Sequence, residues 1–273
     1  MKHANALVLA ACTAFAGAAQ AAPVDLNDWT AESYSAVSGF GAGVWTPAAD
    51  GSSVTQSVNG QPTMYYSDFS AYGTKVTGKI RMANSGDDDF VGFVIGFDPG
   101  DASSGGADYL LIDWKRGTQN FNFGTPSTTP GGFADAGLAV SRVTGIPTAD
   151  EFWQHTDYDT HTGGGLEELE RGATLGATGW NFNTDYEFTF DFGPNDLEVY
   201  VNGVKQLDIT GSFANGRLGF YNFSQASVTY SAFTLEDGTF PDDPTEPPID
   251  VPEPGALGLL GLGVLAVALR RRR

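Results

Sequence analysis

The stretch Asp87-Asp88-Asp89-Phe90-Val91-Gly92-Phe93-Val94-Ile95-Gly96-Phe97 joins three adjacent acids to eight residues that are all apolar or glycine. A short apolar run of this kind predicts a central β-strand that is buried on both faces. Neighbouring residues of a strand point to opposite faces, so the three acids must be gathered by a turn, and Asn84-Ser85-Gly86 supplies one. The sequence therefore predicts an acidic turn that leads directly into a central strand.

Other strands are expected on either side of this run. Residues 186–192 alternate, with four aromatic residues on one face and Glu187, Thr189 and Asp191 on the other. Asn202-Gly203 predicts a tight hairpin because both residues tolerate positive φ. A loop with at most one helical turn is expected over 166–171. The remaining strands are expected at 75–82, 109–114, 119–123, 197–201, 205–209, 217–223 and 227–235.

Several segments, in order, resemble the C-terminal domain of thrombospondins. They are the acidic run with its strand, Tyr109 to Trp114 with Lys115 and Gln119, Phe152-Trp153-Gln154-His155-Thr156, Gly179-Trp180, and Gly216 to Phe220 with Phe223-Ser224-Gln225. The resemblance covers about residues 27–235 and implies an all-β, lectin-like jelly-roll β-sandwich of the concanavalin A-like kind. Thrombospondins also carry cysteines near their last strand and type 3 calcium repeats, and neither occurs here. Functions that depend on those features are not expected to transfer.

The N-terminal residues predict export. Met1-Lys2-His3 is followed by an apolar, alanine-rich run, and Ala19-Gln20-Ala21 has the small-x-small pattern of a signal peptidase site. A signal peptide is therefore expected over 1–21, with cleavage after Ala21. A lipoprotein box ending at Cys12 is the competing interpretation. Cys12 is the only cysteine, so the mature domain, expected over 22–235, has no disulfide of its own.

The C-terminal residues predict a sorting tail. Pro252-Glu253-Pro254, the apolar stretch from Gly255 to Leu269 and four arginines resemble the PEP-CTERM signal, expected over 252–273. In that family a membrane exosortase is thought to cut at the tripeptide. A helix over the apolar stretch is roughly 22 Å long and crosses a ~30 Å hydrocarbon core only with help from snorkelling arginines. A plain C-terminal membrane anchor is the alternative.

The composition narrows the classes of partner. Residues 236–251 are rich in proline and acids and are expected to form an extended spacer rather than a domain. The formal net charge of −19 repels nucleic acid and attracts divalent cations. Membrane contact is expected only through the C-terminal tail, before processing, with final delivery to the cell surface or extracellular matrix.

The acidic turn is the strongest site candidate. Three consecutive carboxylates repel one another, and a bound cation relieves that repulsion. Ca²⁺ prefers carboxylate, carbonyl and water oxygens, so Asp87, Asp88 and Asp89 are predicted as its ligands, and the resemblance to a calcium-binding domain supports this. Asp98 and Asp101, at the far end of the central strand, form a possible second metal site.

Other candidates have competing interpretations. Trp153 and Trp180 are expected in the core, with stacking on a sugar ring as the alternative. Asp157 to His161, near His155, is either a metal cluster or a solvated loop. Glycosidases need two carboxylates ~5–9.5 Å apart across a cleft, whereas Glu187 and Asp191 are expected to face away from the core.

The favoured function is a non-enzymatic, exported, calcium-binding adhesion or extracellular-matrix module. The first alternative is a lectin that binds exopolysaccharide. The second is a glycoside hydrolase built on the same sandwich. Glycine-rich phosphate loops and hydrolase motifs are not found in the sequence, so we expect no catalytic residues.

Overall fold

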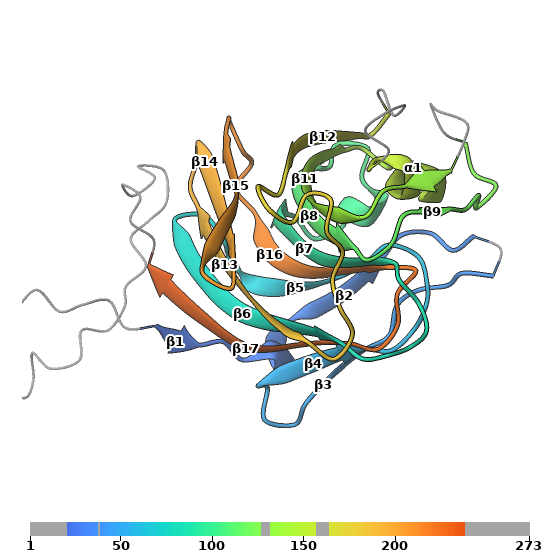
Figure 1. Ribbon diagram of the computed structural model, residues 1–273. Coiled ribbons are helices and arrows are strands. Elements are labelled where there is room, and N and C mark those ends of the chain that lie inside the picture. The colour runs from blue at the N-terminus through green and yellow to red at the C-terminus, as the bar shows by residue number, and fades with distance from the viewer. Residues whose placement is uncertain (1–20, 38, 127–131, 157–163, 238–273) are drawn as a thin grey trace, which may run out of the picture. The chain divides into compact units, whose positions relative to one another are not determined.

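The computed structural model describes residues 21–37, 39–126, 132–156 and 164–237, all within one unit that extends to Pro241. Two large antiparallel sheets pack face to face (Figure 1). The first sheet follows the order β15-β14-β13-β6-β17-β4-β3, with β1 on β17. Its strands are β1 (Ala22–Pro23), β3 (Trp45–Pro47), β4 (Ser53–Gln56), β6 (Thr74–Met82), β13 (Asp185–Phe192), β14 (Asp196–Val201), β15 (Val204–Thr210) and β17 (Val228–Asp237).

The second sheet has seven strands in the order β12-β11-β8-β7-β16-β5-β2. They are β2 (Thr30–Ser33), β5 (Thr63–Ser70), β7 (Phe90–Phe97), β8 (Asp108–Lys115), β11 (Gly137–Thr144), β12 (Leu166–Arg171) and β16 (Arg217–Phe223). The smaller elements are the ribbon β9 (Gln119–Asn120) and β10 (Phe133–Ala134), the 3₁₀ turns η1 (Leu26–Asp28) and η2 (Asp101–Ser103), and helix α1 (Ala149–Gln154). The expected all-β sandwich is confirmed.

Strand β7 lies at the centre of the seven-stranded sheet and all eight of its residues are buried, as predicted. Val91, Phe93 and Ile95 enter the core between the two sheets. Phe90 and Val94 enter a second apolar cluster on the other face, together with Phe152 and Trp153 of α1. The unbroken apolar run is therefore explained by a strand that has a core on each side.

The hairpin and the alternating aromatic strand are also confirmed. Asn202 and Gly203 have φ values of 50° and 76°, which is the positive-φ pair that a tight hairpin requires. Along β13 the four aromatic residues are buried, while Glu187 is exposed and Asp191 is half-buried.

Several local predictions were wrong. Residues 166–171, expected as a loop, form edge strand β12, which pairs with β11. In the segment 119–123 only Gln119–Asn120 is a strand. Helix α1 was missed although its sequence signal is present: Thr148 and Glu151 form a reciprocal capping box. Strand β17 runs to Asp237, two residues into the segment predicted as spacer.

The predicted signal peptide and the predicted sorting tail lie almost entirely outside the described residues. This applies to Cys12, to residues 1–20 and to the tail with Pro252, Glu253 and Pro254. Among the described residues, we find no helix of the length and apolar character needed to cross a bilayer.

Candidate metal centre

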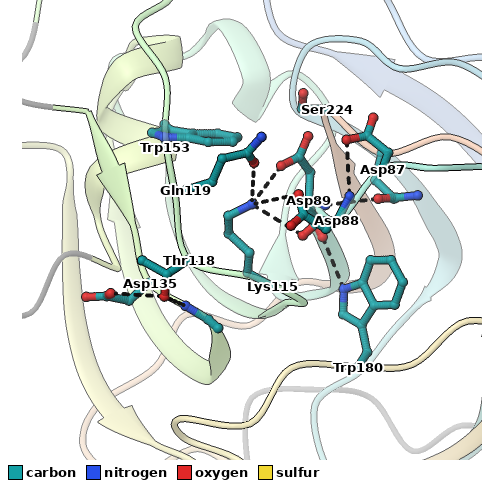
Figure 2. A network of polar contacts seen from close by, with 12 residues as sticks. Asp87, Asp88, Asp89, Lys115, Thr118, Gln119, Asp135, Trp153, Trp180 and Ser224 are labelled. Carbon is teal, nitrogen blue, oxygen red and sulfur yellow. Dashed lines mark hydrogen bonds and ion pairs between the residues drawn. The ribbon is translucent and has the colours of Figure 1, made fainter.

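The three predicted ligands lie together at the start of β7. Asp87, Asp88 and Asp89 each place one carboxylate oxygen within 4.8 Å of the others (Figure 2). Asp87 and Asp88 are half-buried, whereas Asp89 is only 3% exposed. The turn therefore presents two carboxylates toward solvent and holds the third inside the protein.

Lys115 neutralises the inner carboxylate. Its Nζ lies 2.7 Å from Asp89 Oδ1 and 3.9 Å from Asp88 Oδ1, and its side chain is fully buried. Nζ also donates to the Asp88 carbonyl at 3.3 Å and to Gln119 Oε1 at 3.0 Å. Figure 2 shows these contacts converging on the ammonium group. A protein cation therefore occupies the inner side of the acidic turn.

The aromatic side chains around Lys115 complete its pocket. Nζ lies 4.5 Å from the centroid of the Trp153 ring and 5.3 Å from that of Phe90. Cation–π attraction of this kind is strongest when the ammonium is removed from water. Strand register brings the groups together, because Lys115 on β8 pairs directly with Phe90 on β7.

Backbone and amide contacts fix the conformation of the turn. Gln225 Oε1 accepts from the Asp89 amide at 3.0 Å, and Trp180 Nε1 donates to the Asp89 carbonyl at 3.1 Å. Asn59 Nδ2 donates to Asp87 Oδ2 at 2.5 Å. The acids are thus held in place by segments far away in the sequence.

Burial raises the pKa of the Asp89 carboxyl from 3.8 to about 7, against the opposing effect of the Lys115 ammonium. The neighbouring Asp87 raises it further. The expectation that a divalent ion alone relieves the repulsion among the three acids needs correction, because Lys115 supplies part of the neutralising charge. Asp87 and Asp88 are the two acids left for an added cation.

The second acidic turn uses its carboxylates structurally. Asp101 Oδ2 accepts from the Asp98 amide at 2.8 Å, and Asp101 is buried while Asp98 is exposed. Glu32 on β2 caps the same turn by accepting from the amides of Gly100 and Ala102, both at 2.9 Å. Burial raises the pKa of Asp101. A metal role for Asp98 and Asp101 gains no support from these contacts.

The two tryptophans are core residues. Trp153 and Trp180 are each 1% exposed. Trp153 Nε1 donates to the Gly132 carbonyl at 2.8 Å. Stacking on a sugar requires one open ring face, which neither side chain offers in this structure, so their sugar-binding role is corrected to a structural one.

A buried acid–imidazole pair was missed by the sequence analysis. His155 Nε2 lies 3.1 Å from Asp113 Oδ2, and both side chains are at most 1% exposed. Asp113 belongs to β8, and His155 caps the C-terminal end of α1. Burial lowers the pKa of His155, but the Asp113 carboxylate outweighs this effect and raises it above 6.5. Residues 157–161, considered either as a metal cluster near His155 or as a solvated loop, lie outside the described residues.

The two carboxylates considered for glycoside hydrolysis lie on the outer face of β13. Glu187 and Asp191 are four residues apart on one strand, which separates their backbones by about 13 Å. Glycosidases instead place their two carboxyl groups on either side of the scissile bond within a cleft.

Together, the antiparallel two-sheet sandwich, its buried central strand and the acidic turn define a β-sandwich module with a candidate cation site. The chain belongs to the thrombospondin C-terminal region family, whose model matches residues 41–237. A second model, the PEP-CTERM protein-sorting motif, matches residues 250–273 and indicates an exported, surface or extracellular protein with a C-terminal sorting tail. That motif implies processing by an exosortase.

Curated relatives agree with this assignment at low identity. Thrombospondin-3b of Danio rerio is 24% identical over 73% of this chain, and thrombospondin-2 of Gallus gallus is 28% identical over 70%. The matches span only 21% and 16% of those relatives.

Two similar structures are the carbohydrate-binding module CBM66 from Bacillus subtilis and the Ca²⁺- and Man-bound exoplasmic/lumenal domain of VIP36. The first has a TM-score of 0.46 at 12% identity and covers 71% of this chain and 91% of its own. The second has a TM-score of 0.47 at 10% identity and covers 79% and 85%.

Proposed function

We propose that this protein is an exported, non-enzymatic, calcium-binding adhesion or matrix module that acts at the cell surface or in exopolysaccharide. The observation that supports it is the acidic turn, where oxygens of Asp87, Asp88 and Asp89 lie within 4.8 Å of one another. Lys115 is bound mainly to Asp89. Asp87 and Asp88 would therefore hold most of the Ca²⁺, together with water molecules.

The proposed division of the chain follows its signals. The signal peptide is removed after Ala21, the sandwich carries the binding function, and the acidic spacer leads to a sorting tail over 252–273 that an exosortase cuts. The intact mass of the exported protein tests both processing sites. A mass that retains the residues after Pro254 contradicts cleavage at the tripeptide.

Calcium binding is tested by calorimetric titration and by thermal unfolding of the exported protein after treatment with chelator. A ligand that binds only the folded state stabilises it by about 2.7 kcal/mol when its free concentration is 100-fold above Kd. We expect Ca²⁺ to raise the melting temperature, and we expect Asp87→Asn combined with Asp88→Asn to abolish the shift.

Asp185→Asn is the matched control, because Asp185 is an exposed carboxylate whose ion-pair partner is Arg81 rather than a group of the turn. It should leave the Ca²⁺ response unchanged. If 10 mM Ca²⁺ does not alter the melting temperature of the wild-type protein, the calcium function is wrong.

A second candidate function is carbohydrate binding. It is favoured by an uncharged cavity beside α1, whose lining includes Tyr34, Gln61 and Phe152.

A further inference from the structure

A cavity of about 230 Å³ lies where the end of β2, the start of β5 and the N-terminus of α1 meet. Its lining includes Tyr34, Gln61, Pro62, Thr125, Pro147 and Phe152, and no charged side chain of the described residues lines it. The volume is just below the ~300–1,000 Å³ typical of pockets for drug-sized ligands. The cavity therefore suits one ring-sized, neutral group.

Gln61 supplies the polar contact. Its side chain is 1% exposed, and among the described residues Nε2 has no hydrogen-bond partner. A buried donor without a partner costs about 1–3 kcal/mol, and a ligand oxygen removes that cost. Because most of the remaining lining is apolar, a bound group needs one acceptor facing Gln61 and otherwise carbon-rich surface.

An aromatic cluster continues from the cavity. The Phe40 ring lies 5.0 Å from the Phe123 centroid and 5.8 Å from the Phe121 centroid, and Phe121 is 39% exposed. Phe40 pairs through its backbone with Val37, which lines the cavity. The cluster thus offers a partly exposed aromatic surface next to the cavity mouth.

The rim is held in place before any ligand arrives. The buried carboxylate of Asp150, near the start of α1, accepts from the amides of Phe123 and Thr125 at 2.8 and 2.6 Å. Thr125 lines the cavity, and Phe123 belongs to the aromatic cluster. A rim fixed by these bonds loses little conformational entropy when a ligand binds.

We infer that the cavity and the Phe40–Phe121–Phe123 cluster bind a neutral glycan whose sugar carries a substituent with both a methyl group and a carbonyl oxygen, such as an acetamido group. Its methyl group packs on the apolar wall, and its carbonyl oxygen accepts from Gln61 Nε2. Unsubstituted hexoses place several hydroxyls against a lining that is mostly apolar, and uronic acids are repelled by the net charge of −19. The inference rests on the carbohydrate-binding function and names its site and ligand class.

The test is calorimetric titration of the exported protein with N-acetylglucosamine oligosaccharides, with glucose oligosaccharides and oligogalacturonate as comparison ligands. Gln61→Leu and Phe121→Ala should each weaken binding about fivefold to tenfold, because each removes one contact.

Phe133→Ala is the control, because Phe133 is 51% exposed and lies on β10, which pairs with β9 just before Phe121. It pairs with Asn120 and so projects from the opposite ribbon face to Phe121. It should bind the acetamido sugar like wild type.

Two results overturn the site: no binding of the acetamido oligosaccharides by the wild-type protein at 10 mM, or equal weakening by Phe121→Ala and Phe133→Ala. Preferential binding of glucose oligosaccharides or oligogalacturonate overturns the ligand class.

Binding of a glycan that is unaffected by Gln61→Leu and Phe121→Ala preserves the carbohydrate function and refutes this site. The calcium response of each variant, measured in parallel, separates failure here from failure of the calcium function.

Discussion

Replacing Lys115 by Met should make the stability of the protein depend steeply on pH above neutrality. In the wild type, the pKa of Asp89 is about 7 in the folded state and 3.8 as its ordinary value. A carboxyl whose pKa is raised by folding contributes stability that is fully present below 3.8 and is lost as pH rises through the folded value. The loss of stability therefore levels off near pH 7 in the wild type, where Asp89 ionises and the Lys115 ammonium pairs with its carboxylate.

Without Lys115 the buried carboxyl of Asp89 loses the ammonium group that lies 2.7 Å away in the wild type. It therefore stays protonated to higher pH. Each further pH unit then removes about 1.4 kcal/mol of stability. Between pH 7 and pH 9, Lys115→Met should fall behind the wild type by about 3 kcal/mol, beyond any offset that is already present at pH 6.

The assay is urea unfolding at intervals from pH 5 to pH 9 in the presence of EDTA. Lys115→Met combined with Asp89→Asn should lose this extra slope, because the buried carboxyl that produces it is gone. Lys205→Met removes a partly exposed lysine that pairs with Glu198 and Asp208, and it should follow the wild-type profile. A constant stability difference between Lys115→Met and wild type over this pH range would refute the reasoning.

Three further predictions concern the core. The pKa of His155 is raised above 6.5, so its stabilising contribution is complete below pH 6.5 and is lost at higher pH; Asp113→Asn should remove that part of the slope in the same urea series. Gly92→Ala should lower the melting temperature markedly, because an added Cβ meets the Ile112 carbonyl oxygen at 2.0 Å, and a circular dichroism melt will show it. Tyr230→Phe should lose about 1–3 kcal/mol in urea unfolding, because its buried hydroxyl donates to the Tyr221 carbonyl at 2.8 Å and accepts from the Gly92 amide at 3.4 Å.

Much of the fold could be predicted from local sequence. The β7 run, the alternating β13 and the Asn202-Gly203 turn are recognisable because burial on one or two faces imposes a residue pattern on the strand itself. Strand β12 was missed because its residues 166–171 are mostly charged. It is an edge strand, and pairing with β11 decides its conformation.

The candidate site was predicted in part. The acidic turn is recognisable from three consecutive aspartates, and the structure confirms that their side chains lie together. The sequence analysis attached no role to the charge of Lys115, and no local pattern indicates that Asp113 meets His155. The Lys115–Asp89 contact joins residues that are 26 positions apart in the sequence, and the His155–Asp113 contact joins residues that are 42 positions apart. The register of β7 with β8 and the packing of α1 create these contacts.

The sequence by itself determined the C-terminal sorting motif, the β class, the acidic turn and the family, because each depends on contiguous residues or on their order along the chain. Only the tertiary structure decided that Trp153 and Trp180 are buried and that a lysine faces the acids. It also decided that an amide without a partner lines an uncharged cavity. Burial and charge compensation depend on which strands become neighbours. The packing of the whole chain decides which strands those are.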